Sequence, residues 1–126
     1  MKLVIGGAFQ GKKDFAQNAY HVTSWADGRN CDWEEVFCAG GILHFHEYIR
    51  RMLSDGRDPA QLIQRLAKEN PDVVIVTNEL GYGVVPVDQF DRAYREKTGR
   101  VCCKVAQVAQ EVHRVVCGLG TVIKHG

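Results

Sequence analysis

Residues 73–86 read VVIVTNELGYGVVP, and the first five of them decide the fold. Val73–Thr77 is β-branched throughout and apolar except at its last position. A short run of this kind, entered through Asn70-Pro71-Asp72, is typical of a strand buried on both faces. Such strands belong to parallel sheets that are covered by helices. The stretch therefore predicts an α/β domain with a mostly parallel sheet.

The second half of the same stretch is polar and rich in glycine. Asn78 and Glu79 are polar, Gly81 and Gly83 permit close approach of a backbone to a ligand, and Pro86 ends the loop. Open α/β sheets bind ligands beyond the carboxyl ends of their strands. We therefore expect this loop to form the floor of a binding site. The Glu79 carboxylate could instead belong to a salt bridge or cap a helix.

A second glycine-rich segment follows the first predicted strand, Leu3-Val4-Ile5. Residues 6–13 read GGAFQGKK, which has the GxxxxGK spacing of a P-loop, and a helix is predicted over residues 13–20. In a P-loop, backbone amides, a lysine and the helix N-terminus hold phosphate groups. The alternative is a glycine-rich turn that binds nothing. The predicted phosphate-binding residues are Gly6, Gly7, Ala8, Gly11, Lys12 and Lys13, although Lys13 replaces the Ser or Thr whose hydroxyl ligates Mg²⁺.

Length and composition limit the classes of protein. The 126 residues predict a single P-loop-like α/β domain over residues 1–126, with 45% apolar and 25% charged residues. A net charge of +1 without a concentrated basic face argues against a nucleic-acid partner. The five cysteines are odd in number and lack CxxC spacing, which predicts neither a disulfide framework nor a zinc site. Because we find neither a signal peptide nor a membrane-spanning apolar run, we expect a cytoplasmic protein without a membrane partner.

The middle of the chain is less clearly patterned. We expect a small strand at residues 21–23, a helical turn beginning at Asp32, and a helix over residues 42–53. His44 and His46 would lie in that helix with their rings well apart, as surface or boundary residues rather than metal ligands. Asp58 followed by proline predicts the start of the next helix.

The last third of the chain predicts two helices and a hairpin. Asp88 is a plausible N-cap for a helix to about residue 97, and Thr98-Gly99 separates it from a helix over residues 100–109. A strand over residues 112–117 and an antiparallel edge strand at residues 121–123 follow. Arg92 and Arg95, three residues apart, would lie on one helix face that is either solvated or in contact with phosphate or another subunit.

Several of these segments resemble the adenosylcobinamide kinase/adenosylcobinamide-phosphate guanylyltransferase family. They are VTNELGYGVVP (residues 76–86), the two arginines that follow, TGRV (98–101), Glu111-Val112, and CGLG (117–120) through Lys124, together with the P-loop-like amino end. The resemblance implies a three-layer P-loop NTPase-like fold, nucleoside triphosphate binding, a homo-oligomer and a place in cobalamin synthesis or corrinoid salvage. Family members phosphorylate the aminopropanol arm of the corrinoid and then transfer GMP to it through a guanylylated histidine.

The sequence also departs from the family pattern. The segment between the P-loop helix and Val73 is several tens of residues shorter, and in the family it holds the nucleophilic histidine and a central strand with an acidic, metal-associated residue. We do not transfer the histidine's role to His44 or His46. Cys102-Cys103 replaces an Asn-Gln pair in the late helix.

Three hypotheses follow. The first is a corrinoid kinase that uses ATP or GTP, with Lys12 and Glu79 catalytic, Mg²⁺ as a possible cofactor and guanylyl transfer lost. In it, Lys12 and the loop amides hold the phosphates, while Glu79 organises Mg²⁺ or the acceptor hydroxyl. Asn78, Glu79, Gly81 and Gly83 line the same pocket as the glycine-rich loop. The second is a non-catalytic paralogue that binds a nucleotide or a corrinoid. The third is a structural paralogue whose loop holds only adventitious anions.

Overall fold

The structure is a computed structural model that describes residues 1–7, 11–79 and 88–125. Its centre is a six-stranded sheet in the order β2-β3-β4-β1-β5-β6, in which only β6 runs antiparallel to its neighbour. The strands are β1 (Lys2–Gly6), β2 (Trp25–Asp27), β3 (Gly41–Leu43), β4 (Val74–Asn78), β5 (Glu111–Val116) and β6 (Leu119–His125). The helices are α1 (Lys12–Tyr20), α2 (Phe45–Ser54), α3 (Leu62–Glu69) and α4 (Gln89–Val108), with 3₁₀ turns η1 (Glu35–Phe37) and η2 (Pro59–Gln61).

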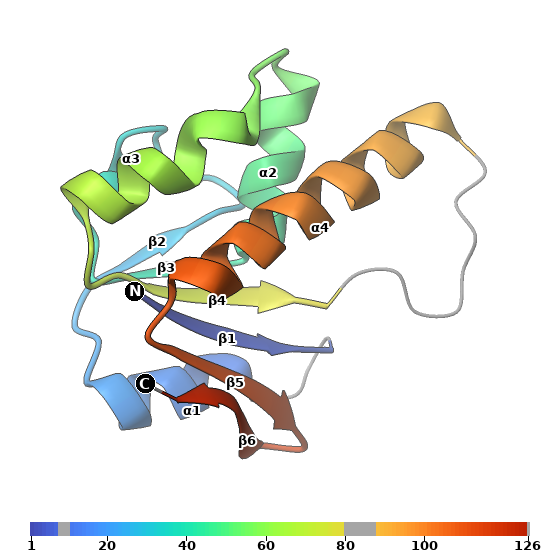
Figure 1. Ribbon diagram of the computed structural model, residues 1–126. Coiled ribbons are helices and arrows are strands. Elements are labelled where there is room, and N and C mark those ends of the chain that lie inside the picture. The colour runs from blue at the N-terminus through green and yellow to red at the C-terminus, as the bar shows by residue number, and fades with distance from the viewer. Residues whose placement is uncertain (8–10, 80–87, 126) are drawn as a thin grey trace.

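The helices cover the sheet unequally. Figure 1 shows α1 alone on one face and α2, α3 and α4 together on the other. Two apolar clusters correspond to these two interfaces, a small one that includes Ala16 of α1 and a large one beneath the other three helices. This arrangement confirms the predicted three-layer α/β fold with a mostly parallel sheet.

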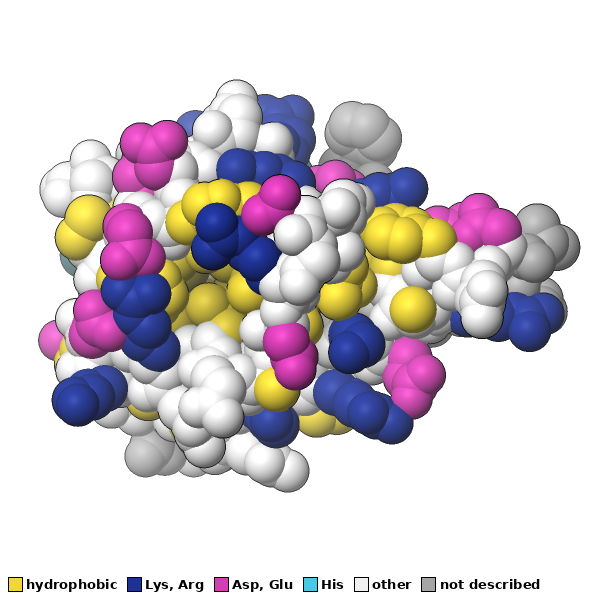
Figure 2. All heavy atoms as spheres, turned by 90° about the horizontal axis from the view of Figure 1, so that it is seen from above, with side chains coloured by type: hydrophobic (Ala, Val, Ile, Leu, Met, Phe, Trp, Pro, Cys, Tyr) yellow, Lys and Arg dark blue, Asp and Glu magenta, His cyan; other side chains and the backbone are white. Residues whose placement is uncertain are grey.

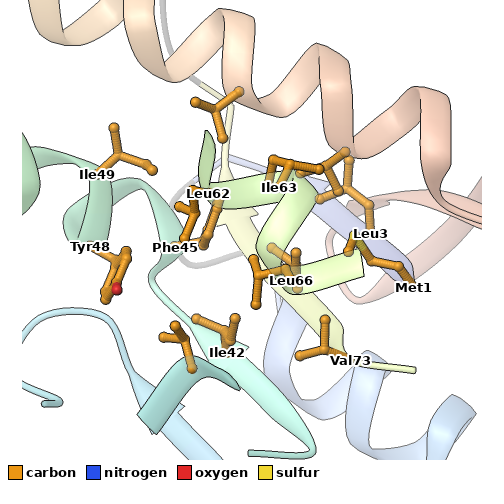
Figure 3. Packing of buried hydrophobic residues seen from close by; sticks show 14 of the residues in the cluster. Met1, Leu3, Ile42, Phe45, Tyr48, Ile49, Leu62, Ile63, Leu66 and Val73 are labelled. Atoms are coloured by element: carbon orange, nitrogen blue, oxygen red, sulfur yellow. The ribbon is translucent and has the colours of Figure 1, made fainter. Parts of the chain in front are cut away.

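The large cluster holds the helical layer on the sheet. Phe45, Ile49 and Leu66 are fully buried and project from α2 and α3 toward the strands, where Ile42 and Leu3 are also buried (Figure 3). Each such side chain contributes about 1.5–3 kcal/mol by leaving water. The carboxyl ends of β1, β3 and β4 are therefore held at one edge of a well-packed sheet.

The strand predicted from the β-branched run is confirmed. β4 lies between β3 and β1 and is buried at every position up to Thr77. Ile5 pairs with Thr77 and Gly6 with Asn78, so β1 and β4 end side by side. The loops that follow these two strands consequently leave from the same edge of the sheet.

The strand predicted at residues 21–23 is wrong. His21 is the C-cap of α1 in a left-handed conformation (φ 54°), and its amide donates to the Gln17 carbonyl. The strand β2 begins only at Trp25, where the chain reaches β3. The helical turn predicted from Asp32 is also short, because it is the 3₁₀ turn η1, which begins at Glu35.

The helix predicted over residues 42–53 is wrong at its start. Ile42 and Leu43 belong to β3, where Ile42 pairs with Ile75 of β4, and α2 begins at Phe45. His44 makes the turn between them in a left-handed conformation (φ 51°). A strand therefore does lie beside β4 in the segment where the resemblance implied the loss of a central strand.

The break predicted at Thr98-Gly99 is wrong as well, because α4 is one continuous helix. Tyr94 and Val101, on either side of the break, are buried and hold this part of the helix on the core, which offsets the weak helix propensity of Gly99. Two apolar residues of this helix are exposed, Phe90 at 38% and Val108 at 50%.

Other boundaries follow the sequence. Asp88 caps α4 by accepting the Asp91 amide, and Asp58 caps η2 by accepting the Ala60 amide. The hairpin of β5 and β6 confirms the predicted antiparallel edge. Among the described residues, no helix is both long and apolar enough to span a membrane.

Candidate functional site

A cleft lies at the carboxyl edge of the parallel strands. It has a volume of about 430 Å³, within the range of small-ligand pockets. It is lined by the start of α1, by the ends of β3 and β4, by the start of α2, and by Arg29, two residues after β2. The lining residues are Gly11, Lys12, Lys13, Asp14, Arg29, Leu43, His44, His46, Val76, Thr77 and Asn78.

The β1–α1 connection brings Lys12 into this cleft. A Cβ at Gly6 would lie 2.5 Å from the Val115 carbonyl oxygen, so β1 can end there only with a glycine. Gly11 has φ 79°, which turns the chain into α1 at Lys12. The Lys12 side chain turns back toward the strand end, and its Nζ donates to the Gly7 carbonyl at 2.6 Å. Glycines thus shape both ends of the turn around one lysine.

The charge of Lys12 is held in a restricted environment. The residue is 9% exposed, and burial lowers the pKa of its ammonium group, while the Glu79 carboxylate opposes this shift. The first backbone hydrogen bond of α1 joins Phe15 to Gly11, so the amides of the first helical residues point out of the N-terminus. A buried ammonium group and a helix N-terminus together favour an anionic ligand.

Asn78 and Glu79 extend the site across the end of β1. Asn78 lines the cleft together with Lys12. The Glu79 carboxylate accepts from Arg114 Nε at 2.7 Å and Nη2 at 3.3 Å, so the ion pair bridges β4 and β5 over the β1 terminus. The Glu79 amide also donates to the Gly6 carbonyl at 2.8 Å. The salt-bridge role left open by the sequence is thus present, beside the cleft rather than in its lining.

Three predicted site residues, Ala8, Gly81 and Gly83, lie outside the described residues. Gly6 and Gly7 are at the strand end, and Gly11, Lys12 and Lys13 line the cleft.

The carboxylates near the cleft do not form a magnesium site. Lys13 occupies the position of the usual hydroxyl ligand, and the oxygens of Asp27 and Glu79 accept from Arg29 and Arg114. Over residues 1–7, 11–79 and 88–125, no three His, Cys, Asp or Glu side chains are grouped so that they could hold a metal ion. Asp14 is the remaining carboxylate of the lining, and the described residues do not make up a Mg²⁺ site on their own, without phosphate ligands.

His46 is buried under the end of β4, contrary to the predicted surface or boundary position. It is 6% exposed, and its Nδ1 accepts from the Asn78 amide at 3.1 Å. The proton of the neutral ring is therefore on Nε2. Burial, with smaller contributions from the charges of His44 and Lys12, lowers the pKa of His46 to about 4. The neutral ring joins the start of α2 to the strand end that carries Asn78.

His44 faces a carboxylate across the cleft edge. Its Nδ1 lies 3.1 Å from Asp27 Oδ1, and its ring centroid lies 6.1 Å from that of His46. Asp27 also accepts from Nε and Nη2 of Arg29, which is the largest cause that lowers the pKa of this carboxyl group to about 2. The carboxylate is thus ionised and points at one nitrogen of the imidazole ring.

Sequence reasoning missed the contribution of these two histidines. The sequence predicts that both histidines of the HxH pattern lie within a helix, whereas His44 precedes α2 and only His46 lies within it. The signal that could have located them is the apolar Ile42-Leu43 pair directly before His44. A short apolar run that ends in a polar residue is typical of a parallel strand with a site residue at its carboxyl end.

A second hollow, of about 470 Å³, lies on the helical face. It is bordered by Trp33, Phe37 and Met52 and by the charged side chains of Arg57 and Arg65. Figure 2 shows apolar side chains gathered on this face, with charged side chains around them. The arginines stack on the aromatic rings, Arg57 over Trp33 and Arg65 over Phe37. This hollow is remote from the strand ends and holds none of the predicted site residues.

A central β1 that ends in a glycine-rich turn, followed by a helix that begins with a buried lysine, defines a P-loop-type α/β protein. A family model described as cobinamide kinase / cobinamide phosphate guanyltransferase matches residues 54–123. The chain belongs to this family.

Curated relatives match over a shorter stretch. The chain is 48% identical over 52 residues to the bifunctional adenosylcobalamin biosynthesis protein CobU of Salmonella typhimurium (strain LT2), and equally to that of Escherichia coli (strain K12). In both comparisons the match covers 41% of this chain and 29% of the relative. The chain therefore matches less than a third of the length of these relatives, and the residues that contribute α1 and His44 precede the range matched by the family model.

Proposed function

We propose that this protein is a nucleotide-dependent phosphotransferase of the cobinamide kinase type, in cobalamin synthesis or salvage, without guanylyl transfer. The observation that carries the proposal is the position of Lys12. Its buried ammonium group lies at the strand end in the same cleft as Asn78, beside the N-terminus of α1. ATP or GTP would place its phosphates there, and the corrinoid would present a hydroxyl group.

Two residues are proposed as catalytic. Lys12 binds the phosphates together with the amides of the loop, including Gly6, Gly7, Ala8 and Gly11. Glu79 orients the acceptor hydroxyl, for which its ion pair with Arg114 must open. The proximity of the Lys12 and Glu79 charges supports this pairing of roles, because the carboxylate raises the pKa of the ammonium group. The remaining binding residues are Lys13, Asn78, Gly81 and Gly83.

Calorimetric titration with ATP and with GTP, each with and without Mg²⁺, tests nucleotide binding. We expect Lys12→Met to weaken binding at least tenfold, since it removes a charge-assisted contact worth about 1.5–3 kcal/mol. Lys97→Met is the matched control, because Lys97 is exposed on α4 outside the cleft. Equal affinity of the Lys12→Met variant and the parent protein would contradict the proposal.

Transfer from γ-labelled nucleotide to adenosylcobinamide tests the kinase activity itself. Nucleotide binding without transfer would favour the alternative, a non-catalytic nucleotide- or corrinoid-binding paralogue. Incubation with α-labelled GTP tests the loss of guanylyl transfer. We expect no acid-labile, base-stable adduct, and such a label on His44 or His46 would contradict that part of the proposal.

A homo-oligomer is also proposed, from the family resemblance. The edge strand β6 is exposed along its whole length, with Leu119 at 75%, Val122 at 53% and Ile123 at 57%. Apolar side chains on an edge strand are unusual in a protein that stays monomeric. Light scattering after size-exclusion chromatography measures the oligomeric state directly.

A further inference from the structure

We propose that His44, oriented by Asp27, accepts the proton of the acceptor hydroxyl during phosphoryl transfer. This inference rests on the proposed kinase function and adds a residue to it. It assigns the proton to Nε2 of His44, and it assigns Asp27 and Arg29 a positioning role.

The backbone of His44 supports a role in the cleft. The residue has φ 51° and ψ 48°, a left-handed conformation that costs a non-glycine residue about 1 kcal/mol. Histidine, like asparagine, is among the non-glycine residues that adopt this conformation more often than most, so the turn tolerates it. The conformation presents the ring between the end of β3 and the start of α2, in the same cleft as Lys12 and Asn78.

The contact with Asp27 fixes which nitrogen of His44 is available. An ionised carboxylate only accepts hydrogen bonds, so the nitrogen 3.1 Å from Asp27 Oδ1 carries the proton. The neutral ring then has its lone pair on Nε2. Arg29 holds the carboxylate in place through Nε and Nη2, at 3.2 and 2.8 Å from Oδ2.

The other described polar side chains in or beside the cleft are less suited to accept a proton than His44 Nε2. Lys12 and Arg29 are only donors, and His46 Nδ1 is already occupied by the Asn78 amide. The Glu79 carboxylate accepts from Arg114. The Asp14 carboxylate also lines the cleft, but it lies in the first turn of α1, at the proposed phosphate site. An oriented imidazole nitrogen is therefore the group suited to take up a proton.

The step balances as follows. The acceptor oxygen attacks the γ-phosphorus of the nucleotide and loses its proton to His44 Nε2. The bond between the γ-phosphorus and the β–γ bridging oxygen breaks, and the nucleoside diphosphate leaves with that electron pair. The resulting imidazolium is stabilised by the Asp27 carboxylate and later gives its proton to water.

The deciding variant is His44→Asn. Asparagine tolerates the left-handed conformation, and its amide group can still donate to Asp27, but it has no basic nitrogen. We expect kcat for phosphoryl transfer to fall about 100-fold, at the low end of general-base effects, with nucleotide affinity unchanged within about twofold. His21→Asn is the control, because His21 has the same backbone conformation (φ 54°) at the far end of α1 and is not in the cleft.

The Asp27→Asn variant tests the positioning role through a property independent of turnover. Long-range ¹⁵N–¹H spectra report the tautomer of each histidine. We expect the Nδ1–H form of His44 in the parent protein and a shift toward the Nε2–H form in Asp27→Asn, with a lower kcat. Asp55→Asn is the control, because it breaks an exposed Asp–Arg pair of the same i, i+2 spacing with Arg57.

The outcomes separate this assignment from the proposed function. A His44→Asn variant with kcat within threefold of the parent overturns the assignment alone. So does a parallel loss of nucleotide affinity or an Nε2–H tautomer in the parent. A covalent guanylyl label on His44 overturns the assignment together with the proposed loss of guanylyl transfer. A parent protein that binds nucleotide but transfers no phosphoryl group overturns the proposed function and this assignment together.

Discussion

Lowering the pH from 7 to 5 should destabilise the protein through His46. The ring is neutral in the folded state, with a pKa of about 4 against an ordinary value of 6.5, because burial disfavours its charged form. Below pH 6.5 the unfolded chain binds a proton that the folded protein does not. Stability is therefore complete above pH 6.5 and decreases as the pH falls toward 4.

The size of this effect follows from the two pKa values. Linkage between pH 7 and pH 5 gives a loss of about 2 kcal/mol in the free energy of unfolding from this one residue. The low pKa of Asp27, about 2, does not interfere, because that carboxylate titrates mainly below this window in both states. An effect of about 2 kcal/mol is a large part of the stability of a small domain.

Urea denaturation at a series of pH values measures the effect. The matched variant is His46→Asn, in which the side-chain oxygen can accept from the Asn78 amide in place of Nδ1 but does not titrate. We expect the parent to lose about 2 kcal/mol more than this variant between pH 7 and pH 5. His125→Asn, at an exposed position in β6, should keep the pH dependence of the parent. Identical pH profiles for the parent and His46→Asn would refute the reasoning.

Three further predictions concern the Glu79–Arg114 pair, the helix α4 and the end of β1. Glu79→Gln and Arg114→Gln break the same ion pair and should lower the melting temperature by similar amounts. Only Glu79→Gln should lower kcat, since only this variant removes the carboxylate. Equal losses of kcat in the two variants would assign the ion pair a structural role. Gly99→Ala should stabilise the protein by about 1 kcal/mol in urea denaturation, because its Cβ would enter open space within a helix. Gly6→Ala should destabilise it by about 1–3 kcal/mol, because the new Cβ would overlap the Val115 carbonyl, and unchanged stability would contradict the close approach there.

The main features of the fold could be predicted because they depend on local patterns. The run Val73–Thr77 is β-branched and apolar, and its burial on both faces follows from that composition alone. The N-caps at Asp58 and Asp88 are equally local, since each depends on one side chain and the amides that follow it.

The errors arose where tertiary contacts outweigh local pattern. Ile42 is spaced from Phe45 and Ile49 as in a helix, but it pairs with Ile75 of β4 instead. The pattern is misleading because a strand and the helix that follows it can place their apolar side chains in the same core. Gly99 weakens an isolated helix, yet the buried side chains of Tyr94 and Val101 on either side of it keep α4 continuous. Such outcomes depend on which strands and helices pack against one another, and local sequence patterns do not specify this.

The candidate site shows the same division. The position of Lys12 followed from motif spacing and that of Asn78 from the end of a recognisable strand. The orientation of His44 depends on Asp27, seventeen positions earlier and on another strand. The Glu79–Arg114 pair likewise joins strands that are neighbours of β1 but distant in the chain. Contacts of this kind become visible only when the order of the strands is known.

The central position of β1 has a consequence for the way the chain acquires its structure. Lys2 pairs with Val74 on one side and with Glu111 on the other, so both partners of β1 follow it far along the chain. Until these partners have been synthesised, its apolar residues, Leu3 and Val4, have no strand to pair with in the finished register. Pairings this remote in sequence form slowly, because a long loop must close first. We therefore expect folding to be completed only after β5 has been synthesised, with the P-loop segment among the last parts to take its final form.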